Sequence, residues 1–431
     1  MIPLSLDEVR SLCPGTIDPA AGAGEITGFQ IDSRRIEPGD LFVAIGRGAD
    51  FAGEARDNGA IATLVSNDPF GALAALASAV RARSHALVVG ITGSTGKTST
   101  KDILAALCRP HARTVAAEGG HNNEIGLPLT LARIEPETEI VIAEMGMRGL
   151  GQIAELCAIA RPDIGVITSI GPVHLELLGT VERVAQAKAE VVLALPAGGT
   201  AVIPTAAPEL DPFVRRGDLE IVRFGPGGDI ELERFEPPVL AARVDGHRVE
   251  IEVPFTARYQ AANTLAALAA YRALGLPLDR VGVGALEIVL SRWRGEELDL
   301  PGGVLLINDC YNANPVSMRA ALDHLAERAG SRRKVAVLGD MAELGPAAPE
   351  LHRDVGRAVA DAGVHLLVAI GPLACGYLDA RIPATRWTPS IQEAVVGLQE
   401  LLAPGDVVLV KGSRSMGLEA VGDALAGVGV A

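Results

Sequence analysis

Short apolar runs separated by helix-length stretches are the feature that most restricts how this chain folds. In the middle of the chain they occupy residues 86–91, 140–143, 164–170 and 200–204. Strands of a parallel sheet are apolar almost throughout, because crossover helices bury both of their faces. The pattern therefore predicts an α/β fold built on a doubly wound parallel sheet. A more alternating stretch at 230–254 predicts antiparallel strands, ahead of a helix over 260–274.

The same alternation restarts in the last third of the chain. Helical patterns such as the one at 317–328 separate apolar runs at 304–308, 334–339, 365–370 and 406–410. A polar, glycine-rich segment at 291–303 precedes these runs, and a second, smaller doubly wound domain is expected after it. Near the start, a run at 41–45 and a helical stretch at 69–83 predict a small α/β domain.

The length of 431 residues suits several domains. Single cores stop growing near about 250–300 residues, so one compact core is not expected. We expect an N-terminal domain at residues 1–84, a central domain at 85–293 and a C-terminal domain at 294–431.

Composition restricts the partners. A net charge of −15 repels polyanions and an aromatic content of 3% leaves few stacking platforms, so nucleic acid is not expected as a partner. No signal-peptide pattern and no apolar window near about 18 residues is seen, so a cytoplasmic protein without a membrane span is expected. Five widely spaced cysteines predict core thiols rather than disulfides or a CxxC metal site.

The sharpest local motif is VVGITGSTGKTST at residues 88–100, where an apolar run enters a glycine-rich turn and then a helical pattern. Backbone N–H groups of such a turn cradle phosphates, Lys97 reaches the β- and γ-phosphates, and the Thr98 hydroxyl ligates Mg²⁺. The motif departs from GxxxxGK[ST], because Ile91 stands where the first glycine belongs. The alternative is a glycine-rich turn that happens to end in Lys-Thr.

Three further residues are candidates by position. Glu144 and His174 follow apolar runs, at the sheet edge where ligands bind in α/β proteins, and Glu144 offers hard oxygen ligands to Mg²⁺. Lys188 lies in a helical stretch of a chain with few lysines. Each has a plain alternative when it is taken alone: a solvated loop charge for Glu144, a structural role for His174 and a helix-surface charge for Lys188.

The joint arrangement resembles the Mur ligase family nearly from end to end. The matching motifs are DSR at 32–34, PGDLFVA at 38–44, GSTGKT at 93–98, HNNEIGLP at 121–128, EMG at 144–146, HLE at 174–176, AKAE at 187–190, YNANP at 311–315, LGDMAELG at 338–345 and KGSRSM at 411–416. The glycine-rich motif marks the wider family. The last three motifs point to the member that adds D-alanyl-D-alanine (D-Ala-D-Ala) to UDP-N-acetylmuramoyl-tripeptide (UDP-MurNAc-tripeptide).

The resemblance implies three domains: the first binds the UDP-sugar, the second binds ATP, and the third is mobile. It also implies roles for individual residues. The nucleotide site would comprise Gly93, Ser94, Thr95, Gly96, Lys97, Thr98, Ser99, Asn263 for adenine, Asp309 for ribose, Asn312, and Arg294 for the phosphates. Thr98 and Glu144 would hold one Mg²⁺, and His174 with a carbamylated Lys188 a second. Lys97, Glu144, His174, Lys188 and Arg294 would form the catalytic set. Substrate contacts would come from Ser33, Arg34, Asn122, Asn123, Asp340 and Arg414.

Two departures from the family pattern stand out. The loop at 46–51 is short where the family often has a longer one, which leaves the uridine contacts open. Tyr259 stands where a histidine is usual. A monomer is expected, while the third residue of the tripeptide (lysine or diaminopimelate) and the general base stay open.

Two other functions remain possible at this point. A related ligase such as a folylpolyglutamate synthase shares the central domain but should lack YNANP and KGSRSM. A non-catalytic or motor-like P-loop protein would turn over ATP without an acceptor, and it leaves Lys188 and the third domain without a role.

Overall fold

The computed structural model describes residues 1–19 and 24–427. Two compact units make up this part of the chain. The first unit contains residues 1–169, 186–254 and 262–289, apart from the undescribed gap, and the second contains residues 170–185 and 255–261 and begins again at Leu290. Two short segments from the middle of the chain therefore belong with its last third. The three domain boundaries expected from the sequence stay a prediction.

The beginning of the first unit forms a small α/β layer. Its four-stranded sheet has the order β2-β6-β5-β4, and β5 is buried along its whole length. The predicted helix at 69–83 is present as α3 (Pro69–Arg83), which Asp68 caps through the backbone N–H of Gly71. The remaining elements are β1 (Leu4–Ser5), α1 (Leu6–Leu12), β2 (Thr16–Asp18), β3 (Glu25–Ile26), β4 (Gly28–Gln30), β5 (Asp40–Ala44), α2 (Ala52–Asp57) and β6 (Ala62–Val65).

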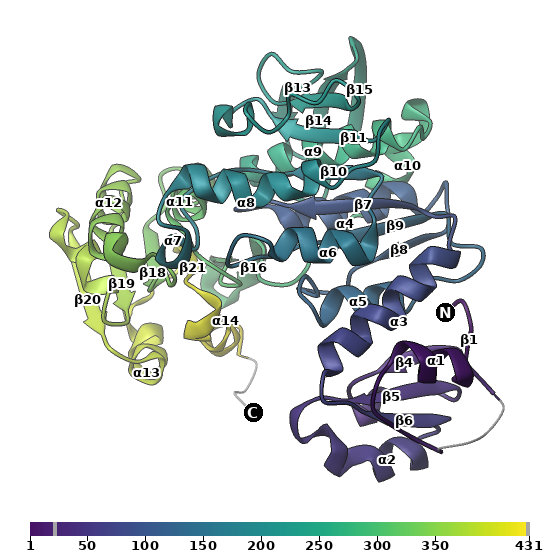
Figure 1. Cartoon of the computed structure of the whole chain (residues 1–431). Helices are drawn as coiled ribbons and strands as arrows, with labels where there is room; N and C mark the ends of the chain where they lie inside the picture. The colour runs from purple at the N-terminus through teal and green to yellow at the C-terminus, as the bar shows by residue number, and fades with distance from the viewer. Residues whose placement is uncertain (20–23, 428–431) are drawn as a thin grey trace. The chain divides into compact units, whose positions relative to one another are not determined.

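A nine-stranded sheet dominates the first unit (Figure 1), with the order β15-β14-β13-β12-β11-β10-β7-β9-β8. It is parallel from β8 to β13, and β13, β14 and β15 are antiparallel, as the sequence predicted. The strands are β7 (Leu87–Thr92), β8 (Thr114–Ala116), β9 (Ile140–Glu144), β10 (Ile164–Ile167), β11 (Thr200–Pro204), β12 (Glu220–Phe224), β13 (Ile230–Glu236), β14 (Val239–Val244) and β15 (His247–Glu252).

Helices pack on this sheet because the strands between them are buried on both faces. The helix after the glycine-rich turn, α4 (Lys97–Cys108), is buried over ten of its twelve residues. The other helices along this stretch of chain are α5 (Gly126–Leu131), α6 (Gln152–Ala160), α7 (Leu175–Leu178), α8 (Val181–Leu193), α9 (Arg258–Ala273) and α10 (Val281–Ala285). Within the first unit, α3 packs against α5 and α6.

The second unit contains a six-stranded sheet of order β16-β17-β21-β18-β19-β20, parallel except for β16. Alternate residues of its strands enter two separate apolar clusters, one with α11 and α12 and one with α13 and α14. This confirms the second doubly wound sheet. Its elements are β16 (Glu296–Leu300), β17 (Val304–Asn308), α11 (Pro315–Ala329), β18 (Lys334–Gly339), α12 (Ala348–Asp361), β19 (Leu366–Ile370), β20 (Ala384–Thr388), α13 (Ile391–Leu401), β21 (Val407–Lys411) and α14 (Glu419–Leu425).

Three sequence expectations need correction here. Glu144 is the last residue of β9 rather than the first residue after it, and β10 ends at Ile167, three residues earlier than predicted. Four cysteines are buried as expected, but Cys375 is exposed. Among the helices that the structure describes, none has the length and apolarity needed to cross a membrane.

The contact between α10 and α4 depends on Gly284. A Cβ atom at this position would lie 2.4 Å from the carbonyl oxygen of Ala106 and 2.6 Å from Cα of Leu107, both backbone atoms of α4. We expect Gly284→Ala to lower the free energy of unfolding by about 1–3 kcal/mol, because the helices must separate to admit the methyl group. Urea denaturation measures this.

Gly282, in the same helix, is the matched control. A Cβ atom there meets nothing within 4 Å. Gly282→Ala should raise the free energy of unfolding, by up to about 1 kcal/mol, through helix propensity. Equal effects of the two substitutions would contradict the close packing of α10 on α4.

Candidate functional site

The glycine-rich turn between β7 and α4 has the backbone that a phosphate-binding loop needs. Gly93 and Gly96 have φ angles of +152° and +81°. A Cβ atom on Gly93 would lie 1.8 Å from Oγ1 of Thr168, and one on Gly96 would lie 2.1 Å from Oδ1 of Asn263. Only glycine fits both positions. The two glycines are therefore required by the conformation of the turn, while its role as a phosphate-binding loop stays a prediction.

The neighbouring strand fixes this turn in place. Beyond the end of β10, Ser169 accepts the backbone N–H of Ser94 at its carbonyl oxygen and that of Thr95 at its hydroxyl, both at 2.9 Å. The ammonium group of Lys97, the first residue of α4, donates to the carbonyl oxygen of Gly93 at 2.8 Å. The N-terminus of a twelve-residue helix and a lysine thus point to the same small region, which suits an anion such as phosphate.

Glu144 ends β9, the neighbour of β7, and its carboxylate is buried with 1% of the residue exposed. Oε1 accepts a hydrogen bond from Nδ2 of Asn122 at 2.9 Å, whereas the buried Oε2 has no hydrogen-bond partner among the described residues. A buried carboxylate oxygen without a partner costs free energy unless a cation or donor occupies the place next to it. The loop-charge alternative is therefore wrong for Glu144.

The donor set fits a hard cation. Thr98, the predicted partner of Glu144, is also buried, and carboxylate and hydroxyl oxygens are ligands that Mg²⁺ accepts. Among the described residues there is no cluster of three or more His, Cys, Asp and Glu side chains that could hold a metal. A cation at Glu144 would therefore take its remaining ligands from hydroxyls, modified side chains, bound phosphates or water.

Lys188 lies on α8 and is 1% exposed, so the helix-surface alternative is wrong for it. Burial, and to a smaller degree the charge of Lys97, holds the pKa of the Lys188 amine well below its ordinary value. No hydrogen bond joins this amine to another described residue. Burial of this kind favours the neutral form of the amine, which is nucleophilic, over the ammonium form.

The remaining predicted catalytic and nucleotide residues lie in the second unit, apart from Asn263 beside Gly96. His174 has a left-handed backbone (φ 53°), and its Nδ1 contacts Oε2 of Glu343. Asp309 follows β17 and receives a hydrogen bond from Nζ of Lys411 at 2.6 Å. Asn312, in the same loop, contributes its carbonyl oxygen to Lys411 at 3.0 Å. Arg294 lies with its guanidinium carbon 3.8 Å from the ring centre of Tyr311.

The predicted substrate residues have different environments. In the first unit, Ser33 is buried and donates to Glu54, whereas Arg34 is exposed and paired with Asp32. Oδ1 of Asn123 accepts the N–H of Gly126, the first residue of α5, at 3.0 Å, so the amide oxygen of Asn123 is engaged locally.

The predicted substrate residues of the second unit also differ in exposure. Asp340 is 8% exposed and accepts the backbone N–H groups of Leu373 and Ala374. Arg414 is exposed and paired with Glu419.

Sequence reasoning missed several residues that hold these parts together. Lys101, one helical turn after Lys97, is buried and donates to the carbonyl oxygen of Ala117 at 2.8 Å, in the segment before Asn122. Lys411 fixes Asp309, and it lies inside the quoted KGSRSM motif. The scarcity of lysine in the chain was the signal that could have singled out both residues.

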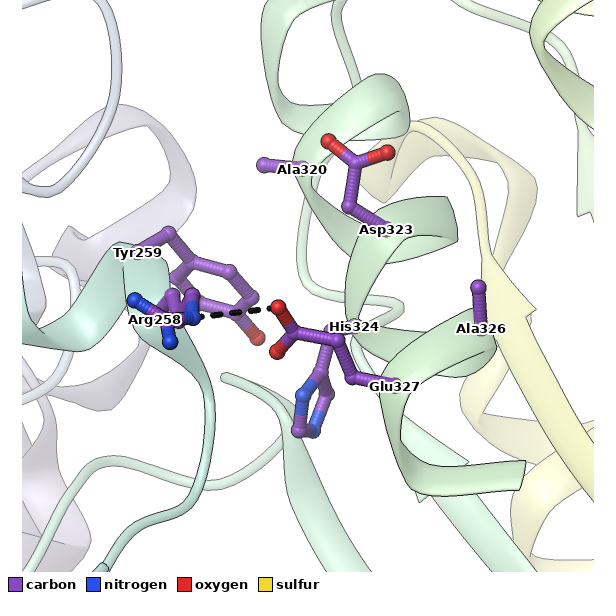
Figure 2. A pocket seen from close by; sticks show the side chains of 7 residues that line it. All are labelled: Arg258, Tyr259, Ala320, Asp323, His324, Ala326 and Glu327. Carbon is purple, nitrogen blue, oxygen red and sulfur yellow. Dashed lines mark ion pairs between the residues drawn. The ribbon is translucent and has the colours of Figure 1, made fainter. Parts of the chain in front are cut away.

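Tyr259, the residue in the place of the usual histidine, lines a cavity of about 400 Å³ in the second unit (Figure 2). The other lining residues come from α11 and from Arg258, which pairs with Glu327 at 3.1 Å. The hydroxyl of Tyr259 is buried and has no hydrogen-bond partner among the described residues.

Family models match most of this chain, and relatives of known name match nearly all of it. The family described as Mur ligase middle domain matches residues 91–271, and the one described as Mur ligase, glutamate ligase domain, matches residues 293–414. A UDP-N-acetylmuramoyl-tripeptide--D-alanyl-D-alanine ligase of Mycobacterium tuberculosis is 33% identical over 99% of this chain and 98% of its own length. The ligase of that name from Escherichia coli is 32% identical over 99% of both chains.

Solved structures agree with the sequence matches. A crystal structure of MurF from Acinetobacter baumannii has a TM-score of 0.87 with 28% identity over 99% of each chain. The MurF ligase of Thermotoga maritima in complex with ADP has a TM-score of 0.81 with 29% identity over 93% of this chain and 97% of its own. A folylpolyglutamate synthase of M. tuberculosis, at 18% identity and a TM-score of 0.67 over 82% and 94% of the two chains, shares the fold alone.

The unpartnered oxygen of Glu144 leads to a prediction about metal-dependent stability. We expect Glu144→Gln to leave the thermal midpoint of the metal-free protein unchanged or higher, because an amide is less costly to bury than a carboxylate. The variant should also lose most of the stabilisation by Mg²⁺ with nucleotide, which reaches about 2.7 kcal/mol for a ligand at 100 times its Kd. Thermal unfolding with and without both ligands measures this.

Glu137→Gln, at an exposed carboxylate, is the matched control and should behave as the unaltered chain. An undiminished effect of Mg²⁺ and nucleotide on Glu144→Gln would contradict the assignment of Glu144 to a cation.

Proposed function

The chain belongs to the Mur ligase family, and we propose that it joins the carboxylate of UDP-MurNAc-tripeptide to the amine of D-Ala-D-Ala with the consumption of ATP. The full-length match to ligases of that name is the observation that carries this function. The product is the UDP-linked pentapeptide of peptidoglycan synthesis. The chain is thus an amide-forming, ADP-producing ligase of cell-wall biogenesis.

The charge of the reactants explains why ATP is needed. A carboxylate is a poor electrophile, so its oxygen first attacks the γ-phosphorus of ATP, which gives an acyl phosphate and ADP. The amine of the dipeptide then adds to the acyl carbon, and the tetrahedral intermediate releases phosphate. Phosphoryl transfer demands mainly positioning and the neutralisation of negative charge.

In this proposal the first unit supplies the phosphate site. The turn from Gly93 to Gly96 and the first N–H groups of α4 hold the phosphates, with Ser94, Thr95 and Ser99 in the same segment. Lys97 exchanges its bond with the Gly93 carbonyl for the γ-phosphate. Asn263, whose amide lies against Gly96, contacts the adenine. Asn122 and Asn123 meet the muramyl part, and Ser33 and Arg34 the UDP part.

We propose Mg²⁺ as the metal of the site. Thr98 and Glu144 would hold one ion, and His174 with a carbamylated Lys188 a second. The ions would neutralise the charge of the phosphates while the phosphoryl group moves. The unpartnered Oε2 of Glu144 and the burial of Lys188 support these assignments.

The second unit would bring the remaining contacts. Arg294 is assigned to the phosphates, and Asp309, held by Lys411, is assigned to the ribose together with the adjacent Asn312. Asp340 and Arg414 are assigned to the peptide substrates. The three-domain boundaries, a monomeric state and a location in the bacterial cytoplasm are parts of the same proposal.

The other functions considered from the sequence are less well supported. The folylpolyglutamate synthase resembles this chain in fold alone, at 18% identity. A motor-like P-loop protein is not supported either, because the matches to ligases extend over the whole chain.

Release of inorganic phosphate tests the function directly. We expect release from ATP only when UDP-MurNAc-tripeptide and D-Ala-D-Ala are both present, with formation of the pentapeptide confirmed by mass spectrometry. Parallel reactions with lysine and with diaminopimelate at the third peptide position identify the natural substrate. Lys97→Ala is the control and should lose about 10²–10³ in rate, the usual effect of removing one such electrostatic contact. Sustained phosphate release without any acceptor would refute the ligase function.

Lys188 leads to a second prediction. Addition of CO₂ to its neutral amine would form a C–N bond, release one proton and give a carbamate anion with two oxygen ligands, which hard Mg²⁺ prefers. Lys188→Ala should therefore lose most ligase activity, and acetate should restore part of it by occupying the vacated space. Sodium chloride at equal ionic strength is the control and should restore none. Full activity of Lys188→Ala would exclude the carbamate.

A further inference from the structure

Arg294 is held in an unusual backbone conformation. The residues on both sides of it, Trp293 and Gly295, have left-handed φ angles of 63° and 78°. Glycine adopts such angles readily, but for a bulky residue such as tryptophan they cost free energy, so the surroundings must hold the chain there. Strained backbone of this kind is often found where a side chain is being aimed.

Backbone hydrogen bonds fix this bend to the end of β17. The N–H of Gly295 donates to the carbonyl oxygen of Asn308 at 3.1 Å, and that of Tyr311 donates to the carbonyl oxygen of Trp293 at 3.3 Å. Gln260 donates from Nε2 to the carbonyl oxygen of Arg294, also at 3.1 Å. The bend at 293–295 and the loop that carries Tyr311 are therefore one connected piece of the second unit.

Guanidinium groups of three arginines lie over two aromatic rings in this piece, and that of Arg292 lies 5.2 Å from the ring centre of Trp293. The guanidinium carbon of Arg294 lies 3.8 Å from the ring centre of Tyr311. That of Arg414 lies 5.0 Å from the ring centre of Trp293 and 5.9 Å from that of Tyr311. The faces of aromatic rings attract cations, and a ring also restricts the rotamers of a long side chain. The whole chain has only two tryptophans and four tyrosines, and one of each is used here.

We propose that Tyr311 and Trp293 are positioning residues, which aim Arg294 at a phosphoryl group and Arg414 at an anionic group of a peptide substrate. This rests on the proposed function, which assigns the two arginines to those ligands. Tyr311 acts on the transferring group through Arg294, and Trp293 acts on substrate binding through Arg414. The strain at Trp293 is the cost of placing a ring where the backbone alone would favour glycine.

The two rings should differ in the kinetic constant that they control. Tyr311→Leu removes the platform of Arg294, and we expect about a tenfold loss of kcat with little change in the KM of ATP. Tyr311→Phe keeps the ring face and should restore the unaltered rate. In Trp293→Gly the KM of a peptide substrate should rise by about 5- to 10-fold, while the thermal midpoint falls because the variant loses a ring that packs on the apolar cluster of α13 and α14.

A double-mutant cycle separates positioning from general damage to the fold. If Tyr311 acts through Arg294, Tyr311→Leu should have no further effect on kcat in the Arg294→Ala background. Trp387→Leu is the matched control, because Trp387 is the other tryptophan of the second unit and no arginine of the described residues stacks on it. It should keep both constants.

The outcomes keep this inference separate from the proposed function. If the unaltered chain does not ligate the two peptides, the proposed function itself is wrong. If it does ligate them, equal kcat for Tyr311→Leu and the unaltered chain, or additive losses in the cycle, would overturn the role of Tyr311. A Trp293→Gly variant with an unchanged KM for both peptide substrates would overturn the role of Trp293.

Discussion

The parallel pairing of β7 with β9 on one side and β10 on the other is the constraint on which the candidate site depends. It aligns the carboxyl ends of three strands, so the segments that follow them meet at one edge of the nine-stranded sheet. Gly93 begins the turn after β7, Glu144 ends β9, and Ser169, beyond the end of β10, binds that turn. A slip of one residue in the pairing of β7 with β9 would move the side chain of Glu144 to the other face of the sheet.

Buried polar groups lie at this edge although burial is costly for them. Glu144 and Lys188 are each 1% exposed, and neither forms an ion pair with another described residue. In an ordinary core these positions would hold apolar residues, because an uncompensated buried charge costs roughly several kcal/mol. Polar side chains are expected at these buried positions if a charged ligand completes the site.

Regular patterns in the sequence predicted the fold well, but they did not predict which polar side chains are buried. The apolar runs identified β7, β9, β10 and β11 of the nine-stranded sheet and β17, β18, β19 and β21 of the six-stranded sheet. They missed β8, β12, β16 and β20. In β20 four of the five residues are exposed, and its sequence, ATRWT, has no apolar run. The glycine-rich motif identified the turn between β7 and α4. A helical pattern in the sequence does not reveal which face of the helix other elements cover. Lys188 taken alone was therefore interpreted as a surface charge. The inclusion of residues 170–185 in the second unit depends on contacts far apart in sequence, such as that of His174 with Glu343.

The use of lysine in this chain separates Lys188 from the others. None of the five lysines is exposed, and arginine, with 33 residues, supplies nearly all cations of the surface. The ammonium groups of Lys97, Lys101, Lys334 and Lys411 each donate to backbone carbonyl oxygens, a role that suits a compact charge with three donors. Within the described part of the chain, Lys188 makes no such bond. A lysine that serves neither as a surface charge nor as a carbonyl clamp is best explained by the chemistry of its amine, which arginine could not provide.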